Sequence, residues 1–264
     1  MNGGGGGGAD AGDLRRELDG GVLRLTIDND ARMNALTGAT TAALIRELGS
    51  TATELAVRVV VVTGAGRAFS SGADLTEVSA EGADPDAIMD GAGRLVTAVV
   101  DAPVPVIARV NGAAVGIGMS LALACDLAYA GPDAYFLQSF LSIGLMPDGG
   151  SSLLLSAAVG RARANELILL GRPLPAAEAA SSGLVAGAAS SLDELDGLVE
   201  AAVRRCAAAP RRAVELTKSA LRAASLHGIG EAIAREGRGQ QELLVSTEFG
   251  DRVTALLTRR HAPA

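Results

Sequence analysis

The sequence is poor in the residues that bind metals or build disulfide frameworks. It has two cysteines, Cys125 and Cys206, and two histidines, His227 and His261. Two cysteines cannot make a disulfide framework or a four-thiolate zinc site. The histidines, the only candidates for a Ser-His-Asp triad, both lie in the last fifth of the chain. We therefore expect a reduced, cytoplasmic protein with no metal, whose chemistry uses carboxylates and backbone N–H groups.

Positive charge is also scarce. The chain has 23 basic and 30 acidic side chains, a net charge of −7, and one lysine, Lys218, which is the single candidate for a Schiff base. The arginines are dispersed singly or in pairs, so they form no stripe of the kind that binds nucleic acid or an anionic membrane. We expect neither partner.

No uncharged run is long enough to suggest a membrane span. The longest run in the apolar region 110–160 covers residues 110–125, and it contains Asn111, Ser120 and three glycines. Asp126 ends it, so the region reads as a buried core. Residues 1–12 are glycine-dominated without the regions of a signal peptide, which predicts a flexible tail.

Residues 13–200 have the pattern of an α/β core. Residues 14–18 and 22–28 flank Asp19-Gly20-Gly21, a sequence typical of a hairpin turn. Residues 57–63 and 104–110 are β-branched runs, apolar on both faces, as strands in a covered sheet require. Further expected elements are helices over 37–55 (with Thr37 as N-cap), 85–100 and 119–125 and an extended segment over 126–130.

Beyond residue 149 the pattern becomes almost wholly helical. We expect helices over residues 149–159, 161–170, 176–182, 192–208, 211–226, 230–246 and 247–260. Residues 201–264 then form a helical C-terminal region after the core.

Two glycine-bearing loops each follow a buried strand, over residues 64–73 and 111–118. Ligands of α/β sheets sit at the carboxyl ends of strands, and such loops can present backbone N–H groups to an oxyanion or a phosphate. The alternative is a pair of tight turns packed against a helix. Neither loop has the spacing of a P-loop.

Five segments in order resemble the enoyl-CoA hydratase/isomerase, or crotonase, family. They are Asn34-Ala35-Leu36 after Arg32, VVVVTGAGRAFSSGADL (59–75), PVIARVNGAAVGIGMSLALACDLAYA (105–130), FLQSFLSIGLMPDGGSSLLL (136–155) and AASSGLVAGA (179–188). The resemblance covers residues 14–260. It implies an α/β crotonase-like spiral of ββα units, an acyl-CoA substrate that brings coenzyme A with it, no separate cofactor, and a homotrimer or homohexamer formed through the C-terminal helices.

The resemblance also implies site residues. Two backbone N–H groups that hold the thioester oxygen, the oxyanion hole, fall on Ala73 and Ile117. Ile117 replaces the usual glycine, so its backbone must avoid positive φ. The positions that line the coenzyme A path fall on Arg32, Ala35 and residues 73–75, which include Asp74 and Leu75.

The two glutamates of the family's hydratases are missing. Ser120 and Phe140 stand at their positions, where they are expected to border the substrate, and hydration becomes a poor expectation. Asp148 remains. From the sequence alone it reads as a helix N-cap, but the resemblance to Δ3,Δ2-enoyl-CoA and 1,2-epoxyphenylacetyl-CoA isomerases implies a proton-shuttling base.

The sequence therefore favours an acyl-CoA isomerase that shifts a double bond. Asp148 is its single base, and an apolar wall of Phe140, Leu141 and Ile143 is expected to desolvate it. Three alternatives stay open: an enoyl-CoA hydratase, another crotonase reaction such as thioester hydrolysis, and a non-catalytic acyl-CoA-binding subunit.

Overall fold

The computed structural model describes residues 13–261, and the tail expected over residues 1–12 lies outside them. Its larger sheet has six strands in the order β1 (Leu14–Asp19), β2 (Val22–Ile27), β3 (Val59–Gly64), β5 (Val106–Val110), β7 (Leu127–Ala130) and β10 (Gly187–Ala188). β1 and β2 form the expected antiparallel hairpin, and the remaining pairs are parallel. The parallel β3–β5 pair confirms that the two predicted buried strands are neighbours.

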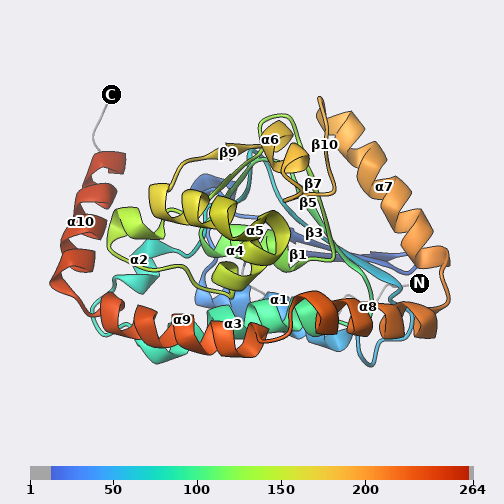
Figure 1. Cartoon of the computed structure of the whole chain (residues 1–264), viewed down its shortest axis with the longest axis horizontal. Coiled ribbons are helices and arrows are strands. Elements are labelled where there is room, and N and C mark those ends of the chain that lie inside the picture. The colour runs from blue at the N-terminus through green and yellow to red at the C-terminus, as the bar shows by residue number, and fades with distance from the viewer. Residues whose placement is uncertain (1–12, 262–264) are drawn as a thin grey trace, which may run out of the picture.

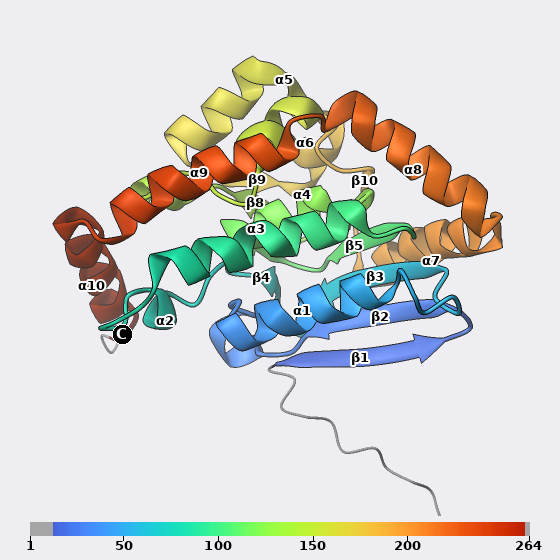
Figure 2. The same ribbon diagram turned by 90° about the horizontal axis from the view of Figure 1, so that it is seen from below.

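Both faces of β3 are buried, because helices cover both sides of the sheet. Val59 and Val61 pack against Leu195 and Val199 of α7 (Leu192–Ala208), which lies along one face in Figure 1. The alternate valines enter the main core with α1 (Gly38–Ser50) and α3 (Pro85–Asp101). Figure 2 shows α1 and α3 running side by side. This alternation explains the continuous apolar run of the strand.

A second sheet has the strand order β4 (Ala68–Ser70), β6 (Ala113–Val115), β8 (Tyr135–Leu137) and β9 (Leu174–Pro175). The prediction that residues 64–73 and 111–118 are loops was therefore incomplete, because each contains a short strand. β4 and β6 pair in parallel with each other. Three residues are too few for an alternating pattern, so these strands depend on their tertiary partners. The helices α2 (Leu75–Val78) and α4 (Ile117–Ala124) follow them.

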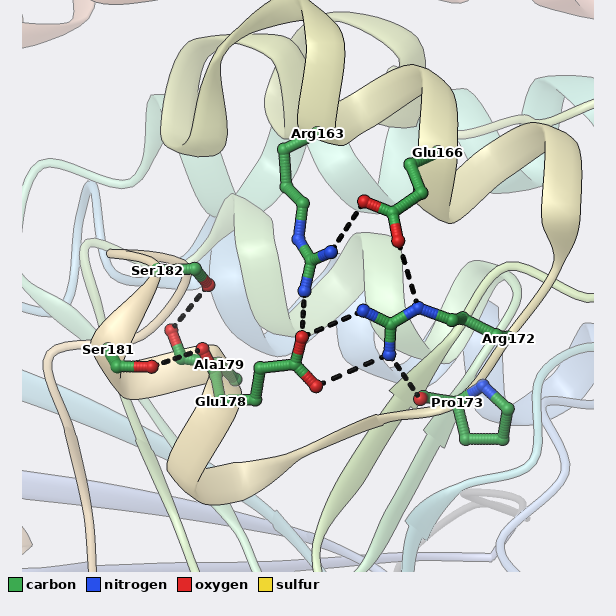
Figure 3. A network of polar contacts seen from close by, with 8 residues as sticks. All are labelled: Arg163, Glu166, Arg172, Pro173, Glu178, Ala179, Ser181 and Ser182. Carbon is green, nitrogen blue, oxygen red and sulfur yellow. Dashed lines mark hydrogen bonds and ion pairs between the residues drawn. The ribbon is translucent and has the colours of Figure 1, made fainter.

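The helix α5 (Ser151–Leu170) bends at Gly160, where φ is 75°, in agreement with the break expected there. A network of ion pairs ties its second half to α6 (Ala176–Ser181). Figure 3 shows its four members, Arg163, Glu166, Arg172 and Glu178. The hydrogen bonds from Arg172 and Arg163 hold the pKa of Glu178 at about 2. The network fixes the direction of the chain after the bend.

The helices α8 (Arg211–Ser225), α9 (Ile229–Leu244) and α10 (Thr247–His261) complete the described chain. α8 has no buried residue and is attached through cations. Arg211 donates to the carbonyl of Thr51 beyond the end of α1, and Lys218 donates to the carbonyl of Val99 near the end of α3. Lys218 also pairs with Asp126, 2.7 Å away. Cations at helix C-termini are favourable because the last carbonyls carry negative partial charge.

Two short 3-10 segments complete the secondary structure, η1 (Asp30–Arg32) and η2 (Phe140–Ile143). Figure 2 shows α9 alongside α3, and α10 packs against η2. No helix within residues 13–261 is long and apolar enough to cross a membrane.

Candidate active site

The segments that follow β3 and β5 are held together by direct contacts. The side chain of Asn111 donates from Nδ2 to the carbonyls of Gly66 and Ala68, at 2.8 and 3.0 Å. Gly72, with φ +95°, approaches β6 so closely that a Cβ there would lie 2.8 Å from the carbonyl oxygen of Val115. A side chain at Gly72 would therefore meet backbone. The parallel β4–β6 pair and these contacts bring the two segments to one place.

At this junction the backbone N–H groups of Ala73 and Ile117 have no acceptor within residues 13–261. The backbone of Leu36 bonds to the two residues that flank Ala73. Its N–H donates to the carbonyl of Gly72, and its carbonyl accepts from the N–H of Asp74. Ile117 is the first residue of α4, where the N–H lacks an intrahelical partner. Gly116 takes the positive φ of 54°, so Ile117 is free of the strain that a left-handed isoleucine would carry.

Arg32 and Asp74, both expected on the coenzyme A path, form an ion pair 2.5 Å long. Arg32 is 57% exposed whereas Asp74 is 4% exposed. Burial alone would raise the pKa of Asp74, but the hydrogen bonds from Arg32 and Thr76 and the charge of Arg32 together outweigh burial, and the pKa is lowered. Asp74 also caps α2 by accepting from the N–H of Thr76. Ala35 is buried and Leu75 is half-buried.

Asp148 is 6% exposed and lies just before α5. Its Oδ2 accepts a hydrogen bond from Nε2 of Gln240 at 3.1 Å, and its Oδ1 has no partner among the described residues. Burial raises the pKa of Asp148 to about 7, the Gln240 bond opposes this, and the charge of Glu236 adds to it. The carboxylate makes no bond to the first N–H groups of α5, so the interpretation as a helix cap was wrong.

The backbone around Asp148 packs on the first turns of α4. Ser120 donates from Oγ to the carbonyl of Asp148 at 3.1 Å. A Cβ at Gly149 would lie 2.5 Å from Cδ1 of Ile117, which places the carboxylate-bearing segment against that residue. A groove of about 430 Å³ between α1 and α3 is lined by Leu36 and Ile117 as well.

The apolar wall expected around Asp148 does not form as predicted. Phe140 is 7% exposed and approaches Gly116, at which a Cβ would lie 3.5 Å from its ring. Leu141 is 43% exposed and cannot desolvate a buried carboxylate. Ile143 packs with Phe140 in a separate cluster beneath α10. A Cβ at Gly149 would lie 3.3 Å from Val96 of α3, a contributor to the enclosure that sequence reasoning missed.

Two further polar residues near Asp148 were also missed, Glu236 and Gln240 of α9. They are 2% and 0% exposed. Glu236 accepts hydrogen bonds from the N–H groups of Gly150, at 2.6 Å, and Ser152, at 2.9 Å. Their spacing of one helical turn puts them on one face of α9, but polar residues on an amphipathic helix ordinarily face solvent. Sequence pattern alone gave no reason to place these two inside.

Comparisons with known proteins identify the family of the chain. The family model described as enoyl-CoA hydratase/isomerase matches residues 17–261. A probable enoyl-CoA hydratase of Rhodobacter capsulatus is 38% identical over 94% of this chain and 95% of that protein. The 1,2-epoxyphenylacetyl-CoA isomerase of Escherichia coli is 32% identical over 91% of this chain and 93% of its own length.

Solved structures give the same result at the level of the fold. The crystal structure of an enoyl-CoA hydratase from Mycobacterium avium subsp. paratuberculosis superposes with a TM-score of 0.88 at 40% identity, covering 96% of this chain and 99% of that one. The α/β core with its parallel sheet and C-terminal helices is thus a crotonase fold. The chain belongs to the enoyl-CoA hydratase/isomerase, or crotonase, family.

Proposed function

We propose that this protein is an acyl-CoA isomerase that shifts a carbon–carbon double bond by proton transfer, with Asp148 as its only base. The observation that carries the proposal is the state of the Asp148 carboxylate. It is buried, one of its oxygens has no partner in the described chain, and its pKa is raised to about 7. A base with a pKa near the working pH is efficient in both accepting and returning a proton.

In the proposed reaction, Oδ1 of Asp148 takes a proton from the α-carbon of an unsaturated acyl thioester. The electrons of the broken C–H bond move into the thioester, whose oxygen becomes an enolate and accepts hydrogen bonds from the N–H groups of Ala73 and Ile117. The carboxylic acid then returns the proton to the γ-carbon. Only a proton moves and no atom is oxidised or reduced, so the reaction requires neither a metal nor a redox cofactor.

The remaining site residues are assigned to binding. Arg32, with Asp74 beside it, is exposed where it can meet the phosphates of coenzyme A, and Ala35 and Leu75 line the path to the two N–H groups. Ser120 and Phe140 border the acyl group. The groove between α1 and α3 that ends at Ile117 is the proposed place of the acyl chain.

The substitution Asp148→Asn tests the proposal. It keeps the shape of the side chain but removes the base, so turnover of a 3-enoyl-CoA should fall by roughly 100- to 10,000-fold. Binding of the thioester, measured by calorimetry, should persist. Ser120→Ala is the control, because Ser120 bonds only to backbone carbonyls, and its effect should be much smaller. Unchanged isomerisation by the Asn variant would assign the chemistry to another group.

Hydration of a 2-enoyl-CoA is the second candidate, favoured by the hydratase name of the Rhodobacter capsulatus relative. A hydratase of the two-glutamate type needs a second free carboxylate. The buried Glu236 already accepts two backbone N–H groups, and the other two positions carry Ser120 and Phe140. Efficient hydration by the wild-type protein would overturn the isomerase proposal. Hydrolysis of the thioester, or tight binding without any turnover, would favour the other two alternatives.

A further inference from the structure

Three buried polar side chains meet where α9 packs against the start of α5. They are Asp148, Glu236 and Gln240, each at most 6% exposed. The approach of α9 is close, because a Cβ at Gly239 would lie 2.1 Å from the sulfur of Met146, two residues before Asp148. Such contact leaves little room for these side chains to rearrange.

Glu236 occupies the N-terminus of α5. Its Oε2 accepts from Gly150 and its Oε1 from Ser152, so both carboxylate oxygens are bound to the amides at which a helix favours negative charge. Gly150, the N-cap residue, offers no side chain for this purpose. Asp148 is only two residues before Gly150, and with Glu236 in place these amides are not available to its carboxylate.

Gln240, one turn further along α9, donates its Nε2 hydrogen to Oδ2 of Asp148. Oδ1 of Asp148 and Oε1 of Gln240 are buried without partners in the described chain. The amide thus fixes the carboxylate through one oxygen and leaves the other oxygen free. An unpartnered buried carboxylate oxygen is costly and requires an explanation.

We propose that Glu236 and Gln240 are positioning residues for the proton transfer by Asp148. Glu236 withholds the α5 amides from Asp148 and places a negative charge beside it, which keeps the carboxylate a strong base. Gln240 holds Oδ2, so that Oδ1 is the oxygen that receives the proton. This inference rests on the proposed function for the reaction, but the coupling between the side chains can be measured without any substrate.

The charged surroundings of Asp148 are simple. Within the described chain, Glu236 is the charge that acts on its pKa. The neighbouring side chains of Val96, Ser120 and Ser151, which contact the backbone at Asp148 and Gly149, carry no charge. Burial also raises the pKa of Glu236, whereas its two amide bonds and the nearby Arg235 oppose the shift. The proposal requires that Glu236 is ionised while Asp148 titrates.

Two variants should shift the pKa of Asp148 in opposite directions. Glu236→Gln removes the like charge and keeps one acceptor, so the pKa of Asp148 should fall by on the order of one unit. Gln240→Met removes a donor to the carboxylate, so the pKa should rise. The control is Glu242→Gln, an exposed charge on the same helix, which should leave it unchanged.

The pKa is read by nuclear magnetic resonance of protein labelled with carboxyl-13C aspartate, and the Asp148 signal is identified by its absence in Asp148→Asn. The acid limb of the pH profile of kcat/KM for isomerisation should shift by the same amounts. If a Glu236→Gln variant folds but leaves the pKa of Asp148 unchanged, Glu236 serves only to cap α5 and the proposal is overturned.

The wild-type protein provides a test that no folding defect can spoil. With glutamate also labelled, the Glu236 signal should show ionisation at lower pH and a second small step where Asp148 titrates. A Glu236 that stays protonated through that range would refute the proposal. If Glu236 and Asp148 are coupled in this way but the protein isomerises no enoyl-CoA, the inferred coupling stands and the proposed function fails.

Discussion

The Asp148 carboxylate, with a pKa of about 7 in the folded protein, links stability to pH. In the unfolded chain its pKa is near 3.9. Between these values the folded state binds the extra proton, so the contribution of this residue favours folding fully below about pH 4 and is lost as the pH rises through 7. Each unit of difference between the folded and unfolded pKa values corresponds to about 1.4 kcal/mol in the free energy of unfolding.

Asp148→Asn should therefore increase the free energy of unfolding relative to the wild type at pH 8, and the difference should shrink toward pH 4. Urea unfolding followed by circular dichroism at both pH values measures it. Glu236, whose pKa is displaced in the same direction, is present in both proteins, so only its coupling to Asp148 remains in the difference. A variant that is less stable than the wild type at pH 8 would show that the carboxylate is stabilised by contacts that the amide cannot replace.

At the level of single residues, the sequence predicted only part of the candidate site. Asp148 and the two N–H positions could be named because motifs of adjacent residues carry them. Glu236 and Gln240 lie about 90 residues further along the chain, and nothing local distinguishes them from the exposed Glu242. Their burial depends on where α9 docks, which is a property of tertiary packing.

Among the structural elements, the β4–β6 pair and its glycines position the two N–H groups. Gly72→Ala combines a positive φ with a clash against the carbonyl of Val115, so it should destabilise the protein by roughly 1–3 kcal/mol and lower activity. Gly197→Ala in α7 is the matched control, because nothing lies near its Cβ position. There alanine should stabilise the helix by about 0.5–1 kcal/mol. Thermal unfolding and kcat/KM of both variants decide between these expectations.

The strands and helices differ in how well the sequence predicted them. β3 and β5 were predicted because long β-branched runs mark strands covered on both faces, and α7 because its apolar residues follow the helical repeat. β4, β6, β8 and β9 were missed because strands of two or three residues carry no periodic signal. Their hydrogen-bonding partners, which are distant in sequence, determine them.

At the scale of the whole molecule, we expect a homotrimer or homohexamer. α8 buries none of its residues in this chain, and Leu216 and Leu221 are 55% and 65% exposed on it. Val253 of α10, by contrast, is 1% exposed within its own chain and is not available for such a contact. Exposed leucines on an amphipathic helix are typical of a surface that a partner covers.

Light scattering should return three or six times the chain mass of 26.4 kDa. Leu216→Glu with Leu221→Glu should lower the measured mass toward that of one chain, because burying two charges in an apolar contact is costly. Leu192→Glu, an exposed leucine on α7, is the control. A single 26.4 kDa species for the wild type at micromolar concentration would contradict the assembly.

The β4–β6 junction has an evolutionary consequence. The two N–H groups at Ala73 and Ile117 belong to the backbone, and backbone contacts and Asn111 fix their positions. Substitutions at neighbouring positions such as Ser120 or Phe140 can change which acids and bases surround a substrate without moving those N–H groups. A lineage with this architecture can therefore exchange one proton-transfer reaction for another through a few side-chain replacements, while the backbone that carries the proposed oxyanion hole is inherited intact.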